Sequence, residues 1–539
     1  MATRYLIPKN IRGEKMKNLK KILCLLISFG MLMGATACGG GGGGTTPSEK
    51  GTLKIASFEG GYGGTWTKAV ADAFMAHNPG ITVEVECNPL IRDEAVTAFE
   101  TGISDYDVYF VDGVNVGNYC ESYGSLADIS ALYSKTSKPK AGDNEESILV
   151  KDKIRPEIVK EMMYGGDRAE FAGKYYTVPS PSGPCSLVLN TDTLDLVLGA
   201  GNWSVPRTTD ELIALCDAIV AAEAEKVIDG VTYPIYAMIY SGQALEYWHY
   251  LYYPWIAQIA GTDAWDSFNS LKINGEYNQA AYQPEGKLEA YTVLETLIKR
   301  SNGYCDIDSM ANKFNASQKY FLQGRACMYI TGDWLEREME GTTAYKPNLQ
   351  MVKTPIISDL GDKLGITDAQ LASLVSAIDN GESSLEGISA DVFKTVKDAR
   401  AITYTLANSA IGAVHSTSQN VDLAIEFFRF MYTDEGINII LRESKSYLPV
   451  INASNYVLSG DLTTFRQSVN DITARELTYI YTSSKDPIRY RAGVEWHLGS
   501  ESPELAMGKK SNAQSAYSFL QNESNLLAQK WSEFLKQVI

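Results

Sequence analysis

Three short strand-like stretches near the start of the chain alternate with two helical ones. Residues 53–58 and 107–111 are mainly apolar, and residues 81–86 alternate apolar and polar side chains as a strand with one covered face does. Helical spacing of apolar residues begins at about Thr65, and residues 95–102 predict a second helix. Because strands joined by helical crossovers pair in parallel, this alternation predicts an α/β fold with ligand sites at the carboxyl ends of the strands.

Helical periodicity recurs through the rest of the chain. Helices are predicted at residues 192–194, 208–222, 286–299 and 424–431, and residues 511–539 predict one or two amphipathic helices. Residues 358–400 are rich in charged and small side chains, and we interpret them as a surface insertion. A chain of 539 residues exceeds the roughly 250 to 300 at which one hydrophobic core stops growing, so two lobes are expected.

The first 50 residues have the pattern of an export leader followed by a tether. Three lysines between residues 17 and 21 precede a short apolar run, and small residues then lead to Cys38 and six glycines. This pattern is typical of a secretory signal and not of a membrane-spanning helix, and Met16 is an alternative start. Ala-Thr-Ala-Cys resembles the lipobox of bacterial lipoproteins. Residues 1–38 are therefore predicted to be a lipoprotein signal peptide, Cys38 the lipid anchor and residues 39–50 a flexible tether, although an ordinary thiol is the alternative for Cys38.

Charge and cysteine usage exclude several kinds of partner. The formal net charge of −17 disfavours nucleic acids and anionic membrane surfaces, since both need clustered cations. Beyond the leader the cysteines are widely spaced without a Cys-x-x-Cys pair, and the whole chain has only 4 histidines. We therefore expect no metal site and no cofactor, and we favour buried free thiols over disulfides.

Several motifs occur in order along the chain. They include FMAHNPGITVEV at residues 74–85, YGSLAD at 123–128 after the strand that ends at Val111, and GKYYTVP at 173–179. A Trp-x-x-Pro-x-Thr-x-x-Glu-Leu pattern follows at 203–212, GRACMYITGDW at 324–334 is the most specific, and AIEFFRF stands at 424–430. Together they resemble the family 1 extracellular solute-binding proteins, the receptors that serve ABC importers of carbohydrates.

The resemblance implies a fold and a mode of action. It implies two hinged α/β lobes of the type II periplasmic-binding-protein fold with a ligand cleft between them. Lobe one would comprise residues 51–179 and 354–447, lobe two residues 184–353 and 449–539, and the chain would cross near 179–184, 354–355 and 447–449. The implied protein is an extracytoplasmic receptor and not an enzyme. It is expected to be a monomer, anchored to the cell membrane, that delivers a carbohydrate such as an oligosaccharide to the transmembrane subunits of an ABC permease.

Candidate ligand contacts follow from the chemistry of sugars and from the resemblance. A sugar is held by flat aromatic rings against its C–H faces and by polar groups around its edge. The resemblance places Trp334 at a stacking position beside Asp333, and Glu59 at an acidic ligand-contacting position in an open glycine-rich turn. A core tryptophan is the alternative for Trp334. Tyr62 either covers the ligand or packs on the turn, and Asp112 either contacts the ligand or caps a helix.

Two further regions supply candidates. The stretch from Glu246 to Trp255 is unusually aromatic, and we expect Glu246 and Trp248 to contact ligand before Trp255, with much of the stretch in the core. Arg491 and Trp496 precede the C-terminal helices, about where carbohydrate receptors of the family have another stacking tryptophan.

Other functions stay open at this point. Ferric-ion receptors of this fold use adjacent tyrosines, which occur at 175–176 and 252–253, and polyamine receptors need an acidic cleft. A secreted glycoside hydrolase would need two carboxylates flanking one bond. No catalytic motif surrounds any acidic residue, and neither a Gly-x-Ser-x-Gly elbow nor a His-Glu-x-x-His motif is present, so we assign no catalytic residue.

Overall fold

The computed structural model describes residues 51–138, 146–342, 344–498 and 501–539. The expected signal peptide, the lipid anchor at Cys38 and the tether at 39–50 lie outside these residues. All six cysteines within the described ranges are free thiols, as the sequence suggested. Among the described helices, none combines the length and the apolar character needed to cross a membrane.

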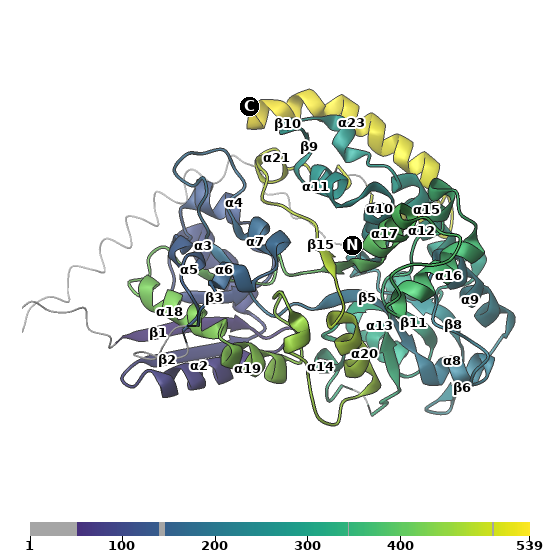
Figure 1. Ribbon diagram of the computed structural model, residues 1–539, viewed down its shortest axis with the longest axis horizontal. Helices are drawn as coiled ribbons and strands as arrows, with labels where there is room; N and C mark the ends of the chain where they lie inside the picture. Colours follow the sequence, from purple (N-terminus) through teal and green to yellow (C-terminus); the bar gives the residue numbers. More distant parts are fainter. Residues whose placement is uncertain (1–50, 139–145, 343, 499–500) are drawn as a thin grey trace, which may run out of the picture. The chain divides into compact units, whose positions relative to one another are not determined.

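A five-stranded sheet holds the N-terminal part of the chain (Figure 1). Its order is β2-β1-β3-β14-β4, with β1 parallel to both β2 and β3, as the alternating pattern predicts. The strands are β1 (Thr52–Phe58), β2 (Thr82–Asn88), β3 (Val108–Val111), β4 (Thr177–Pro179) and β14 (Ile411–Val414). Helices α2 (Thr65–His77) and α3 (Ile91–Thr101) form the crossovers. Around them lie α4 (Val116–Asn118), the π-helix η1 (Tyr119–Tyr123), α5 (Ser130–Tyr133), α6 (Val150–Lys153), α7 (Pro156–Met162), α18 (Val421–Met431) and α19 (Asp434–Ser444).

A second sheet has the order β15-β13-β5-β11-β8, and β12 pairs with β5 beside it. Its strands are β5 (Pro184–Asn190), β8 (Tyr236–Ile239), β11 (Ala326–Gly332), β12 (Leu349–Met351), β13 (Ile402–Thr405) and β15 (Thr478–Ile480). Two hairpins stand apart from it, β6 (Glu225–Ile228) with β7 (Val231–Pro234) and β9 (Lys272–Ile273) with β10 (Glu276–Tyr277).

The remaining α-helices lie between and after the strands of the second sheet in the sequence. They are α8 (Thr191–Leu198), α9 (Thr209–Ala221), α10 (His249–Ala260), α11 (Thr262–Ser270), α12 (Lys287–Ile298), α13 (Phe314–Leu322) and α14 (Leu335–Glu338). Then come α15 (Asp359–Leu364), α16 (Asp368–Asp379), α17 (Ala390–Ala401), α20 (Thr464–Thr473), α21 (Pro487–Tyr490), α22 (Pro503–Met507) and α23 (Ala516–Val538). Every helix predicted from periodicity is present, and α9 begins where the Thr208 side chain accepts a hydrogen bond from the Glu211 amide.

Residues 354–405 differ from the expected boundary. Strand β13 pairs antiparallel with β5, so this segment belongs to the second sheet and not to the lobe that holds β14. Apolar side chains of α16 and α17, such as Leu374 and Val396, are fully buried in the core beside that sheet. The expected surface insertion at 358–400 is therefore a packed part of the second half, and the chain returns to the first sheet through residues 406–410.

Hydrogen bonds tie together the segments that link the two sheets. Ser182, between β4 and β5, donates its amide to the Tyr447 carbonyl oxygen at 2.7 Å. Its hydroxyl lies 3.1 Å from that of Thr405, the last residue of β13. Both Ser182 and Thr405 are fully buried, so the passages between the sheets form one hydrogen-bonded bundle.

Candidate functional site

The candidate residues stand just beyond the ends of four strands. Glu59 follows β1 and Asp112 follows β3, which are parallel neighbours in the first sheet. Asp333 and Trp334 follow β11, and Glu246 comes soon after β8. Strands β8 and β11 are parallel neighbours in the second sheet. The carboxyl ends of parallel strands are where open α/β sheets bind ligands. The structure therefore places four of these residues in loops of the kind that hold ligands, and Glu246 in the short 3₁₀-helix η2 (Leu245–Trp248).

Trp334 lies in an aromatic cluster built from both sheets. Tyr62, in the turn after β1, meets its ring edge-on with centroids 5.7 Å apart. Tyr247 and Tyr250 approach it edge-on at 6.1 and 6.2 Å. A Cβ atom at Gly61 would stand 2.9 Å from Trp334 Cγ, so the glycine lets the turn approach this closely. Trp334 is 5% exposed because a turn of the first sheet covers it.

Asp333 is fully buried beside the segments that link the sheets. Its Oδ2 accepts a 2.5 Å hydrogen bond from the Ser446 hydroxyl, and a Cβ atom at Gly183 would stand 2.1 Å from the same oxygen. Arg466 donates to the main-chain oxygen of Asp333 at 2.7 Å and to Glu336 at 3.0 Å. Burial raises the pKa of Asp333 to about 6, although Arg466 and the Ser446 hydroxyl act in the opposite direction. In this conformation Asp333 contacts the segments that link the two sheets, through Ser446 and Gly183.

Glu59 and Asp112 are engaged within the first half of the chain. Glu59 Oε2 accepts the Gly64 amide at 2.9 Å and so closes the glycine-rich turn. Asp112 forms a two-point ion pair with Arg92, whose Nε lies 2.5 Å from Oδ1. The helix-capping alternative for Asp112 is wrong, because Asn115 accepts the amide hydrogen bond at the start of α4. Both carboxylates remain partly exposed at the strand ends.

Two of the tryptophans named from the sequence are core residues. Trp255 has no exposed surface, and its indole N–H donates to the Pro355 carbonyl oxygen at 3.1 Å. Trp248 is 1% exposed and packs edge-on against Tyr240. Both are covered by their own half of the chain, unlike Trp334. We therefore remove Trp248 and Trp255 from the candidate site and keep Glu246, which is exposed.

Arg491 links the two halves at a second place. Its guanidinium makes two 2.7 Å hydrogen bonds to Glu121 of η1, and the Tyr490 hydroxyl donates to the same carboxylate at 2.6 Å. Burial raises the pKa of Glu121, but the bonds from Arg491 and the tyrosines outweigh it and hold the pKa below its usual value. Trp496 lies elsewhere, with its ring 3.9 Å from the Arg489 guanidinium and packed against Phe268.

Sequence reasoning missed several of these partners. Tyr247 and Tyr250 lie three residues apart at the start of the aromatic stretch, and that helical spacing was a usable signal for one shared face. Glu121, Ser446 and Arg466 carried no such signal. Their roles depend on contacts with residues far away in the sequence.

Comparison with known proteins identifies similar chains. Residues 59–437 match the family model described as bacterial extracellular solute-binding protein. No curated protein matches this chain in sequence.

Among solved structures, an ABC substrate-binding protein from Listeria monocytogenes in complex with cycloalternan is 14% identical with a TM-score of 0.54. The alignment covers 89% of this chain and 99% of that one. A structure reported with xylan utilization by Caldanaerobius polysaccharolyticus is 14% identical with a TM-score of 0.51, covering 90% and 98% of the two chains. A chitin oligosaccharide binding protein is likewise 14% identical with a TM-score of 0.51, covering 86% and 94%.

Proposed function

Since this chain belongs to the bacterial extracellular solute-binding proteins, we propose that it is a receptor that captures a carbohydrate, specifically an oligosaccharide, for an ABC importer. The observation that supports this ligand class best is the aromatic cluster around Trp334, at the carboxyl end of β11 and against a turn of the other sheet. Flat rings of this kind bind the C–H faces of sugars. The similar structures are reported with cycloalternan, with xylan utilization and with chitin oligosaccharide.

The binding mechanism follows from how Trp334 is covered. Tyr62 and Gly61 lie against it from the first sheet, so a sugar reaches the ring only when the two halves move apart at the bundle around Ser182. Glu59 and Asp112 then offer carboxylate oxygens to sugar hydroxyls from the first half, and Glu246 does so from the second. A ligand that contacts both halves stabilises the closed form by its differential affinity.

Delivery completes the proposed function. The closed receptor docks as a monomer on the transmembrane subunits of an ABC permease, while a lipid on Cys38 holds it at the outer face of the cell membrane. The lipobox-like sequence before Cys38 and the glycine-rich stretch after it support this anchor. The protein performs no covalent chemistry on its ligand.

A thermal-shift screen tests the proposal. The purified protein is heated with mono- and oligosaccharides, with spermidine, and with ferric citrate, because a ligand that binds only the folded state raises the melting temperature. We expect a rise with one class of glycan. A rise with spermidine or iron alone would overturn the carbohydrate assignment, and recovery of a shortened glycan after long incubation would show a hydrolase.

A further inference from the structure

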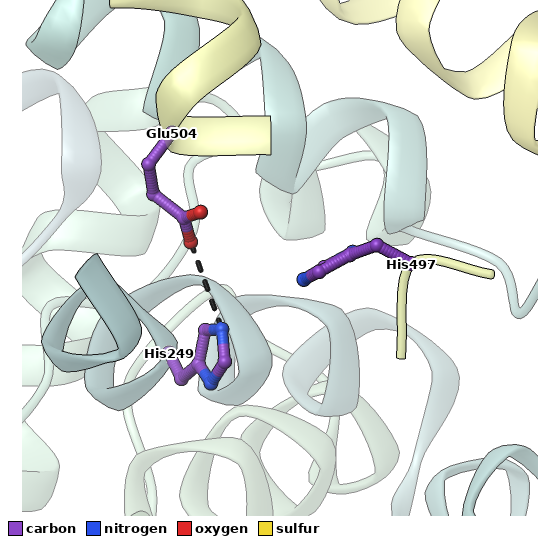
Figure 2. Close-up of side chains that lie close together, drawn as sticks. All are labelled: His249, His497 and Glu504. Carbon is purple, nitrogen blue, oxygen red and sulfur yellow. Dashed lines mark ion pairs between the residues drawn. The ribbon is translucent and has the colours of Figure 1, made fainter. Parts of the chain in front are cut away.

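Two histidines and a glutamate converge in the C-terminal half of the molecule (Figure 2). His249 is the first residue of α10, Glu504 lies in α22, and His497 lies between α21 and α22. One donor atom from each lies within 4.8 Å of the others, and His249 Nε2 is 3.7 Å from a Glu504 oxygen. No other cluster of three such side chains with this geometry occurs in the described parts of the chain.

Glu504 needs an explanation that ordinary packing does not provide. Its side chain is 0% exposed, and neither carboxylate oxygen makes a hydrogen bond of normal geometry to any described residue. The hydroxyls of Tyr252 and Ser502 face this carboxylate. A buried carboxylate that is not fully hydrogen-bonded is costly, and such groups are usually paired or bound to a metal ion.

The surroundings of His497 match those of a metal ligand. Its Nδ1 lies 3.4 Å from Glu523 Oε1, and Nε2 is the ring nitrogen on the opposite side from that carboxylate. The carboxylate of Glu523 is itself held by Lys287, whose Nζ lies 3.0 Å from Oε2. Metal-binding histidines commonly direct their second ring nitrogen at a carboxylate, which fixes the orientation of the ring.

From this geometry we propose that His249, His497 and Glu504 bind a divalent transition-metal ion of the Zn²⁺ type. Two imidazoles and one carboxylate suit such ions, whereas Ca²⁺ and Mg²⁺ favour oxygen ligands. Metal–ligand bonds of about 2.0–2.2 Å require the donors to close by up to about 1.5 Å, which side-chain rotation supplies. Three protein ligands leave a fourth position for water.

The site would fasten the C-terminal segment to the body of the second half. His249 begins α10, a helix that is buried on nearly every side, while the other two ligands lie shortly before α23. The histidine side chains are 16% and 13% exposed, so an ion has a path from solvent. No metal site was expected from the sequence because these three ligands are not closely spaced in it, but the fold brings them together.

Metal titration of the purified protein tests this site. The protein carries no polyhistidine tag and is freed of metal with EDTA before titration with Co²⁺ and Zn²⁺. We expect one ion per chain, visible d–d absorption from bound Co²⁺ that Zn²⁺ abolishes, and a higher melting temperature with Zn²⁺. Ca²⁺ and Mg²⁺ should not displace Co²⁺.

Variants locate the ion. His497→Gln and Glu504→Gln should each weaken Zn²⁺ binding by more than about 100-fold, because changes beside a metal ligand alone cost 10–100-fold. His77→Gln is the control, since His77 lies on α2 and pairs with Glu435. Circular dichroism and thermal melting in EDTA show whether each variant folds. If Glu504→Gln does not fold, His497→Gln tests the site, because the His497 side chain is partly exposed. Absence of stoichiometric Zn²⁺, or equal affinity in folded His497→Gln and wild type, would overturn the proposal.

Discussion

Asp333 and Glu121 are both buried carboxylates that contact residues far away in the chain, yet their surroundings differ. Asp333 accepts one hydroxyl hydrogen bond, and the nearby Arg466 donates to its main-chain oxygen and not to the carboxylate. Glu121 is 3% exposed and receives a two-point bond from Arg491. Burial therefore raises the pKa of Asp333 to about 6, whereas in Glu121 the bonds from Arg491 overcome the effect of burial and lower the pKa.

Because their surroundings differ, Glu121 and Asp333 are expected to act differently when the two halves come together. Glu121 and Arg491 form a charged clamp that holds only while the halves are together. Asp333 lies with Ser446 and Gly183 among the linking segments and stays buried by its own neighbours. We therefore expect the clamp to control closure and Asp333 to control stability at the hinge.

The largest effect is expected from breaking the clamp. Arg491→Ala leaves the buried Glu121 carboxylate with only the more exposed Arg168 guanidinium, 3.7 Å away, and loss of one partner of a buried pair costs about 3–5 kcal/mol. Urea unfolding should show this loss unless the halves separate, in which case solution X-ray scattering should show a larger radius of gyration. Arg168→Ala is the matched control, because Arg168 is 48% exposed and 3.7 Å from Glu121, so its loss should cost less than about 1 kcal/mol. Equal effects of both variants would refute the clamp.

An effect of intermediate size is expected from Asp333→Asn. The pKa of Asp333 is about 6 in the folded chain and about 3.9 in an unfolded one, so the folded state binds more protons between these values. Wild-type stability from this group therefore falls as pH rises from about 4 to 6, by about 3 kcal/mol in all. The variant should lack this slope in urea unfolding at stepped pH.

Glu121→Gln sharpens the same comparison. The pKa of Glu121 is shifted downward, so in wild type its contribution is lost as pH falls and not as pH rises. The two variants should change the pH dependence with opposite signs. Parallel pH profiles for the two would contradict the assigned surroundings.

The smallest expected effect is a loss of ligand affinity at Trp334. Trp334→Ala should weaken the affinity for the glycan found in the screen by about 1–3 kcal/mol, because an aromatic anchor is lost. Calorimetric titration measures this change. Trp255→Phe is the control, since Trp255 is a core residue that should affect unfolding and leave affinity unchanged. Unchanged affinity in folded Trp334→Ala would remove this residue from the site.

Part of the site could be predicted and part could not. Asp333 and Trp334 were named from a motif, and the structure places them at a strand end beside the other sheet. Trp248, expected to contact ligand ahead of Trp255, is a core residue like Trp255. Trp255 lies on α10, which is apolar on almost every side, and such a helix is usually core. The role of Glu121 could be recognised only from its hydrogen bonds with Arg491 in the structure, since no pattern near Glu121 in the sequence indicates an ion pair.

The local elements could be predicted from the sequence, because apolar periodicity records which face of a strand or helix is covered. This periodicity specified β1 to β3 with their crossover helices, and it specified α9 and α18. The folded chain alone shows that residues 354–405 join the second sheet and that His249 lies close to His497 and Glu504. An apolar face indicates that a helix is buried on one side, but it does not identify the element that covers that side. Packing partners depend on contacts between residues far apart in the sequence, and such contacts leave no local pattern.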